Sequence, residues 1–178
     1  MTDGRIAERT LVLLRHAKAE QSADMPDPER PLSVRGRADA AAAGAWLGRH
    51  ALLPDLVLCS PALRTRQTWH GVELGMTGTS DEGGPAGPLP TVRYEPAAYD
   101  ARPEALLELV RSVPEDVSTV LLIAHNPGIS LLSSLLDPAG ADPDGLRTTD
   151  LAVHRTSATW ADLATGAAPI AARHTARG

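Results

Sequence analysis

An arginine and a histidine end an apolar run near the start of the chain. Residues 11–14 are four consecutive aliphatic residues, and Arg15 and His16 follow them directly. Such a run is typical of a strand that is buried on both faces of a parallel sheet. Neighbouring side chains on a strand point to opposite faces, so both residues can reach one ligand only where the chain leaves the strand. Open α/β sheets bind ligands at that edge, which makes the pair a candidate binding site.

A second apolar run, residues 56–59, ends in Ser60, and Arg64 follows four residues later. Ser60 is followed by a proline, and serine at the N-cap with proline at the first helical position is a strong signal for a helix start. We therefore predict a helix that opens at Ser60 and carries Arg64 in its first turn. A solvated arginine would give the same pattern, so this motif alone does not define a site.

A third apolar run, residues 119–124, ends in His125. Asn126 and Pro127 come next, and they predict the N-cap and first residue of a helix that runs through residue 136. A histidine after a strand is often a hydrogen-bonded structural residue, so His125 also has to be interpreted together with the other two motifs.

The three motifs become equivalent if the strands before them are parallel, because the carboxyl ends of parallel strands meet at one edge of the sheet. That edge would gather two arginines, two histidines and the free N–H groups of two helix N-termini, with no carboxylate in the same motifs. Arginine forks match the oxygens of a phosphate group. The sequence therefore predicts a site for a small tetrahedral dianion, a phosphoryl group.

In this order and spacing, the motifs resemble those of the histidine phosphatase (phosphoglycerate-mutase-like) superfamily. They are residues 13–18 (Leu-Leu-Arg-His-Ala-Lys), 60–65 (Ser-Pro-Ala-Leu-Arg-Thr) and 125–128 (His-Asn-Pro-Gly). The first and third forms, and the sequence Arg-Pro-Leu-Ser at residues 30–33, look most like the phosphohistidine phosphatase branch. The resemblance covers roughly residues 10–136.

The resemblance implies a role for each polar residue. His16 would be the nucleophile, taking the phosphoryl group on a ring nitrogen and then losing it to water, while Arg15, Arg64 and His125 would hold the phosphoryl oxygens. Nearby guanidinium charge disfavours a protonated His16, and a backbone carbonyl should accept from its other ring nitrogen. Lys18 would extend the positive field, or it is simply solvated. We expect no metal and no cofactor, since no ligand spacing suggests one.

Hydrolysis of a phosphate ester also needs a general acid for the leaving alkoxide. The candidates are Glu95, Asp100 and Glu82, and no clear motif surrounds any of them. Glu95 is the best placed, because it directly follows a short predicted strand at residues 91–94. A phosphohistidine substrate has a nitrogen leaving group, for which a weak donor suffices, so the missing acid points to that substrate.

The resemblance therefore implies a metal-independent phosphatase that hydrolyses phosphohistidine in a partner protein through phosphorylated His16. One alternative is a small-molecule phosphomonoesterase that acts on small phosphorylated substrates with Glu95 as the acid. An alternative from another class is a non-catalytic phosphate-binding regulatory module. The intact set of Arg15, His16, Arg64 and His125 speaks against that module, since a decayed site would be expected to have lost at least one of them.

Strand and helix patterns alternate along almost the whole chain. We therefore predict an α/β fold, a three-layer α/β/α sandwich with a mostly parallel central sheet, in one histidine phosphatase domain over residues 1–178. Residues 75–90 are rich in glycine and proline and predict a flexible insertion loop. Near the end of the chain, residues 151–154 and 158–163 predict a closing antiparallel hairpin, with residues 170–174 as a further edge segment.

A helix is predicted from a Ser33 cap to about residue 50. It is rich in alanine, and its core-facing side is expected to be formed by Val34, Ala38, Ala41, Ala45 and Leu47.

The composition of the chain argues against some classes of binding partner. The net charge of −5 argues against a general nucleic-acid binder. No apolar run is long enough to span a bilayer, and no secretory leader is recognised, so a cytoplasmic protein with no membrane partner is expected. The single cysteine, Cys59, excludes an internal disulfide and a cysteine-cluster metal site. The oligomeric state stays open.

Overall fold

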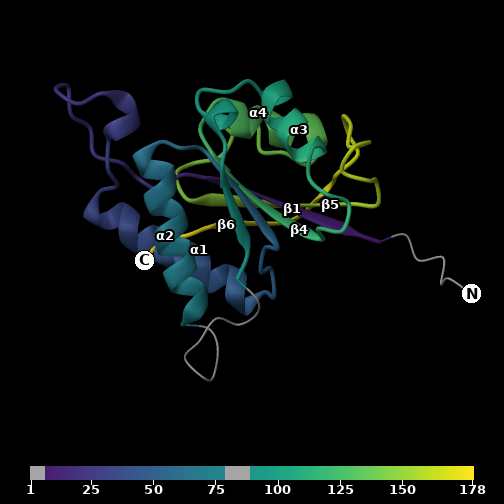
Figure 1. Cartoon of the computed structure of the whole chain (residues 1–178), viewed down its shortest axis with the longest axis horizontal. Coiled ribbons are helices and arrows are strands. Elements are labelled where there is room, and N and C mark those ends of the chain that lie inside the picture. The colour runs from purple at the N-terminus through teal and green to yellow at the C-terminus, as the bar shows by residue number, and fades with distance from the viewer. Residues whose placement is uncertain (1–6, 79–88) are drawn as a thin grey trace, which may run out of the picture.

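The structure is a computed structural model that describes residues 7–78 and 89–178 (Figure 1). Six strands form one sheet in the order β3-β2-β4-β1-β5-β6. Its four strands β1, β4, β2 and β3 are mutually parallel, whereas β5 runs antiparallel to β1 and β6 antiparallel to β5. The mostly parallel sheet confirms the predicted α/β fold. The strands are β1 (Arg9–Arg15), β2 (Leu56–Cys59), β3 (Thr91–Tyr94), β4 (Thr119–Ala124), β5 (Asp150–Thr156) and β6 (Ile170–Thr175).

Two helices cover each face of this sheet (Figure 1). On one side lie α1 (Val34–Arg49) and α2 (Leu63–Thr77), and on the other α3 (Pro103–Arg111) and α4 (Gly128–Leu136). Strand β1 packs against the helices on both faces of the sheet. Its Val12 packs in the core cluster of α1 and α2, and its Leu13 in that of α3 and α4. A strand buried on both faces is what its unbroken aliphatic run predicted.

The predicted core-facing side of α1 is mostly wrong. Val34 is 81 % exposed, whereas Gly36, Ala40 and Gly44 are buried. Both glycines are buried because another backbone lies against them, that of Lys18 at Gly36 and that of α2 at Gly44. A Cβ atom on Gly44 would lie 2.0 Å from a backbone oxygen of α2. The predicted cap is confirmed, since Ser33 Oγ accepts the N–H of Gly36 at 3.0 Å.

Two predicted helix starts are also shifted. Helix α2 begins at Leu63 after an Ala62 N-cap, and α4 begins at Gly128 after a Pro127 N-cap. Ser60 and Asn126 therefore do not cap these helices. Their side chains are hydrogen-bonded to residues distant in sequence, which are described below.

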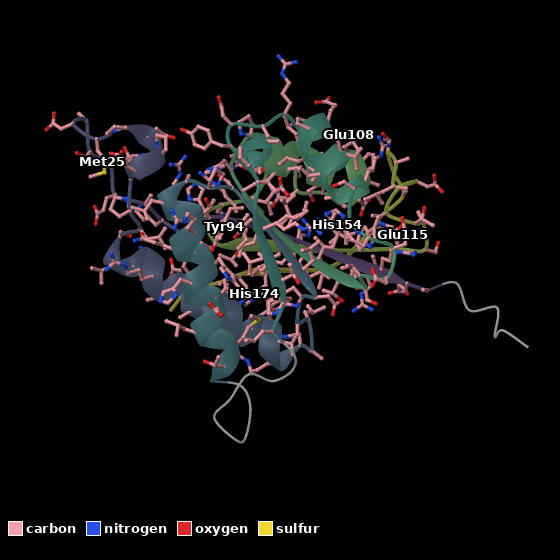
Figure 2. All side chains as sticks on the ribbon, in the orientation of Figure 1. Met25, Tyr94, Glu108, Glu115, His154 and His174 are labelled. Atoms are coloured by element: carbon pink, nitrogen blue, oxygen red, sulfur yellow. The ribbon has the colours of Figure 1, made fainter. Side chains whose placement is uncertain are left out.

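The C-terminal hairpin pairs β5 with β6, not with residues 158–163. That segment is a loop. Its Trp160 is fully buried in the core cluster that also contains α3 and α4 residues, and the indole N–H donates to the carbonyl of Val117 at 2.8 Å. Glu115 (Figure 2) also accepts the backbone N–H of Trp160. Of the predicted loop at 75–90, residues 75–77 belong to α2, and residues 79–88 lie outside the described residues.

Candidate active site

A cavity of about 400 Å³ lies where the parallel strands end. Backbone hydrogen bonds continue the sheet into this region, from His16 to Ala124 at 3.2 Å and from Ser60 to Ile123 at 3.1 Å. The three polar motifs therefore meet at one edge, as parallel strands require. The cavity is lined by Arg15, His16, Lys18, Ala19, Gln21, Arg30, Arg64, His125, Asn126 and Thr148.

His16 is buried at this edge with one ring nitrogen engaged. Its Nδ1 lies 2.8 Å from the carbonyl oxygen of Ala17. A carbonyl only accepts, so Nδ1 carries the hydrogen and Nε2 keeps its lone pair. Burial, followed by the charges of Arg64 and Arg15, lowers the pKa of His16 to about 4, so the ring is neutral near pH 7. Burial is thus a larger cause than the guanidinium charge that the sequence suggested.

The guanidinium groups of the two arginines that line the cavity are already hydrogen-bonded to other parts of the protein. Arg15 Nη1 donates to the carbonyl of Leu146 at 3.2 Å. Burial lowers the pKa of Arg15, and the nearby Asp150 carboxylate opposes that shift. Arg64 donates from Nη1 to the carbonyl of Asp27 at 2.8 Å and from Nη2 to its carboxylate at 2.9 Å. The Nε atom of each arginine is buried with no hydrogen-bond partner in the described part of the chain.

Asp27 is a site residue that the sequence analysis missed. It begins the short 3₁₀ helix η1 (Asp27–Glu29), and its carboxylate accepts from Tyr99, Arg64 and Arg30. Tyr99 and the two arginines lower the pKa of Asp27 to about 2, so it is ionised at neutral pH. Asp27 lies in a polar loop with no motif around it. The need for a counter-charge follows only from the burial of Arg64, which the structure shows.

His125 completes the cluster. Its ring centroid lies 5.2 Å from that of His16, and Tyr99 approaches it edge-on with a centroid separation of 5.5 Å. Its Nε2 is 2.7 Å from Ser60 Oγ, whereas its Nδ1 is buried with no partner among the described residues. Burial, then His16 and Arg64, lowers the pKa of His125 to about 3.

Three buried nitrogen atoms in cavity-lining residues are therefore unpaired within residues 7–78 and 89–178. They are Nε of Arg15, Nε of Arg64 and Nδ1 of His125. Buried polar groups without a partner are rare and call for an explanation. Arginine Nε always carries a hydrogen, so the arrangement suits a ligand that only accepts hydrogen bonds. A phosphoryl group, with its three oxygens, is such a ligand.

The remaining predicted site residues differ in whether they line the cavity. Lys18 lines the cavity, and Glu95 and Asp100 are not among the lining residues. The backbone N–H of Glu95 donates to Cys59 at 2.8 Å, so this residue lies beside the end of β2. Glu82 lies outside the described residues.

The loop before β5 forms a wall of the site. The carbonyl of Leu146 accepts from both Arg15 and Asn126, the latter at 2.8 Å. The backbone N–H of Thr149, at a φ of 61°, donates to the carbonyls of Arg15 and His16. This wall explains why Asn126 is not a helix cap, since its side-chain amide holds the loop.

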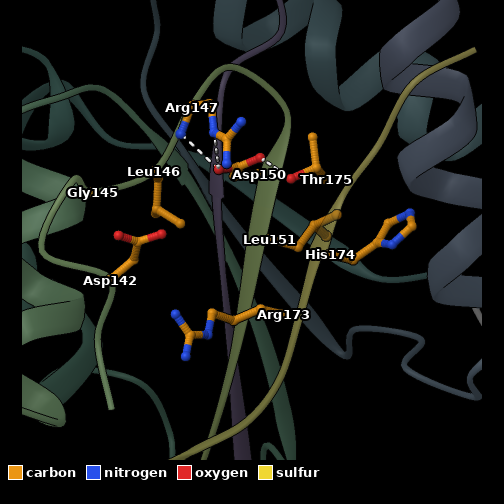
Figure 3. Close-up of a pocket in the computed structure, with 9 residues that line it drawn as sticks. All are labelled: Asp142, Gly145, Leu146, Arg147, Asp150, Leu151, Arg173, His174 and Thr175. Atoms are coloured by element: carbon orange, nitrogen blue, oxygen red, sulfur yellow. Dashed lines mark hydrogen bonds and ion pairs between the residues drawn. The ribbon is translucent and has the colours of Figure 1, made fainter. Parts of the chain in front are cut away.

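Figure 3 shows the outer side of the same wall, where Asp150 anchors it. The Asp150 carboxylate accepts from the backbone N–H of Arg147 at 2.8 Å and from the hydroxyl of Thr175 in β6 at 2.7 Å. The antiparallel strands at the end of the chain thereby support the backbone that carries Arg15 and His16.

Known proteins match this chain in sequence and in fold. The model of the histidine phosphatase superfamily (branch 1) matches residues 11–83. A candidate phosphohistidine phosphatase SixA of Nakamurella multipartitia is 34 % identical with a TM-score of 0.77, and the match covers 95 % of this chain and 96 % of that one. The uncharacterized protein Rv1276c of Mycobacterium tuberculosis is 34 % identical over 92 % of this chain and all of its own.

The chain therefore belongs to the histidine phosphatase superfamily, and it is a phosphatase. Within that superfamily it is similar to SixA proteins, which also include a candidate phosphohistidine phosphatase of Agrobacterium tumefaciens. That protein is 26 % identical with a TM-score of 0.76, over 93 % of this chain and 97 % of the other. In the described residues, no helix is long and apolar enough to cross a membrane, and no group of three or more His, Cys, Asp or Glu side chains could hold a metal ion.

Proposed function

We propose that this phosphatase hydrolyses phosphohistidine in a partner protein, without a metal ion, through a covalent phosphohistidine on His16. The observation that carries the proposal is the state of His16. Its Nδ1 donates to the Ala17 carbonyl, so Nε2 is the bare nitrogen of a ring that lines the cavity, and three other lining residues each hold one buried, unpaired nitrogen atom. The likeness to SixA proteins supports the choice of substrate.

The reaction follows from this arrangement in two transfers. Nε2 of His16 attacks phosphorus while the bond from phosphorus to the substrate's ring nitrogen breaks, and its electron pair returns to that nitrogen. Water then attacks the phosphorus on His16, which releases inorganic phosphate and restores the ring. In both transfers the N–H groups of Arg15 and Arg64 would neutralise charge on the equatorial oxygens, which is the main requirement of phosphoryl transfer.

The carboxylate at the site favours a nitrogen leaving group. Asp27 is bonded to Arg64, and its pKa of about 2 leaves it without a proton to donate near pH 7. An alkoxide leaving from an ester needs such a proton. An imidazole that is protonated on its second ring nitrogen leaves as a neutral molecule and needs none.

The size of the opening supports a protein substrate. The cavity adjoins a second hollow of about 460 Å³, and the two share Gln21 and Arg30 in their walls. Together they offer far more room than a phosphoryl group requires, so a histidine side chain with its flanking backbone could enter.

The test compares hydrolysis of a phosphohistidine-containing protein with hydrolysis of a panel of phosphate esters, with and without a chelator. The variants are His16→Ala, Glu95→Gln and, as a control, His70→Ala, which changes an exposed histidine on α2. We expect rapid, chelator-insensitive phosphohistidine turnover that is lost only in His16→Ala. Acid-labile phosphate should be trapped on His16 of the wild type.

Other outcomes would replace the proposal. A preference for esters, abolished by Glu95→Gln, would identify a small-molecule phosphomonoesterase. Binding of inorganic phosphate without any turnover would identify a regulatory binding module.

A further inference from the structure

The contact between Ser60 and His125 joins two neighbouring strand ends inside the protein. Ser60 follows β2 and His125 follows β4, and these strands are hydrogen-bonded to each other. Ser60 Oγ lies 2.7 Å from Nε2 of His125. Ser60 is fully buried and His125 is 7 % exposed, so water does not compete for this bond. Which of the two groups donates therefore has a chemical consequence.

Two arrangements are compatible with this distance, because a hydroxyl can donate or accept. If Ser60 donates, the single hydrogen of a neutral His125 sits on Nδ1. If Nε2 donates instead, Nδ1 is bare and the hydroxyl hydrogen of Ser60 has no acceptor among the described residues. The N–H of Ala62 also points to Ser60 Oγ, at 3.4 Å, which fills an acceptor position on the oxygen and favours the hydroxyl as donor.

The ring is neutral in the free protein, because burial and the nearby His16 hold the pKa of His125 at about 3. It therefore has one hydrogen to place. Nδ1 is the nitrogen left unpaired in the part of the chain that the structure describes. A phosphoryl oxygen only accepts, so a bare Nδ1 would repel it and an Nδ1–H would bind it.

We propose that Ser60 is a positioning residue that fixes the tautomer of His125, so that Nδ1 presents a hydrogen to the phosphoryl group. His16 obtains its tautomer from the carbonyl of Ala17 instead. The two histidines thereby present opposite functions, a bare Nε2 for attack and an Nδ1–H for binding. The catalytic part of this role rests on the proposed function, whereas the tautomer is a property of the free protein.

The fold contains a matched serine–histidine pair outside the cavity. Ser133 Oγ in α4 lies 2.9 Å from Nε2 of His154 in β5, and both residues are buried. Figure 2 labels His154. Nδ1 of His154 lies 2.7 Å from the carbonyl of Ala168 and must donate to it. The tautomer of His154 is therefore set by a carbonyl and does not depend on Ser133.

The test reads both tautomers directly. Long-range ¹H–¹⁵N correlation spectra of protein labelled with ¹⁵N-histidine distinguish Nδ1–H from Nε2–H rings, and His125→Asn assigns the signals of His125. We expect the Nδ1–H form in the wild type, a substantial Nε2–H population in Ser60→Ala, and the wild-type form in Ser60→Thr. Ser133→Ala should leave His154 in its Nδ1–H form.

Turnover of a phosphohistidine protein supplies the second readout. We expect Ser60→Ala to lower kcat about tenfold, less than the roughly 10²–10³-fold loss that follows removal of an oriented donor, because part of the His125 rings keep Nδ1–H. Ser60→Thr should restore most of the lost kcat, and Ser133→Ala should change it little. The proposal is overturned by an Nε2–H ring in the wild type, or by a ring in Ser60→Ala that keeps Nδ1–H. A changed tautomer with unchanged kcat would also overturn it.

Two contingencies are covered by the same design. If Ser60→Ala does not fold, the wild-type tautomer and Ser60→Thr decide the question. If the wild type turns over no substrate, the proposed function fails, while the spectra still decide whether Ser60 sets the tautomer.

Discussion

At the scale of single residues, the buried position of His16 sets the pH at which the nucleophile is lost. Its pKa of about 4 means that only the neutral ring is present down to mildly acidic pH. We expect the NMR titration of His16 to have its midpoint near pH 4, and kcat/KM to be limited by this group only around that pH. In urea-unfolded protein the same ring should titrate near 6.5.

The pH dependence of kcat/KM is measured from initial rates that are corrected for the uncatalysed breakdown of the phosphoramidate substrate. A His16 titration near 6.5 in the folded protein would contradict the argument, because burial would then impose no cost on the protonated ring.

At the scale of elements, the 3₁₀ helix η1 brings a negative charge to the phosphate-binding arginine. Asp27→Asn keeps groups that can bond Arg64 and Tyr99 but removes the charge of a carboxylate 2.9 Å from Arg64. Loss of that charge should strengthen binding of inorganic phosphate by about 1 kcal/mol, or roughly fivefold. Isothermal titration calorimetry measures the change.

Tyr99→Phe is the matched control, since it removes a hydrogen bond to the same carboxylate while the charge remains. Equal binding by wild type and Asp27→Asn would mean that Asp27 does not influence the anion site.

The packing of α1 against α2 depends on backbone contact. Gly44→Ala would place a Cβ atom 2.0 Å from the carbonyl oxygen of Val72, so the helices must separate. We expect a loss of about 1–3 kcal/mol in the free energy of unfolding and a lower Tm. Gly78→Ala at the end of α2 is the control, because its nearest contact would be at 3.7 Å and its φ of −73° suits alanine. Similar stability of the two variants would exclude close packing as the reason for Gly44.

At the scale of the whole molecule, the buried histidines link stability to pH. The pKa values of His16 and His125 are lowered to about 4 and about 3, whereas unfolded histidine titrates near 6.5. Between these values the unfolded chain binds more protons, so the free energy of unfolding should fall as the pH drops below about 6.5. At pH 4.5 each ring should lower the free energy of unfolding by roughly 2 kcal/mol.

Urea unfolding at pH 7 and pH 4.5 measures this difference. The double variant His16→Asn, His125→Asn should lose most of it, and an undiminished pH dependence in that variant would assign the effect to other groups.

Local patterns were enough to predict the parallel strands β1, β2 and β4 and the arginines and histidines that gather at their carboxyl ends. Strands β1, β2 and β4 each contain an unbroken aliphatic run, and Arg15, Arg64 and His125 follow these runs within a few residues. Parallel pairing then brings the strand ends together without further information.

The inner side of α1 was not predictable in the same way. The sides of an alanine-rich helix differ little in hydrophobicity. The glycines at the contact have no side chain that could mark a buried side in the hydrophobic pattern. Only the approach of α2, with its backbone against Gly44, decided which side is buried.

The hydrogen bonds that hold the site residues likewise depend on the folded structure. Arg64 is bonded to a residue 37 positions away, and His125 to one 65 positions away. Ser60 and Asn126 have the residue types of helix caps, so local chemistry predicted caps. In the folded chain their side chains instead bond His125 and Leu146, because buried polar groups pair with whatever partner the packing brings within reach. Local patterns in the chain were therefore enough to predict that Arg15, His16, Arg64 and His125 meet at the site, whereas Asp27 and the contacts that hold each of these side chains follow only from the packing of distant segments.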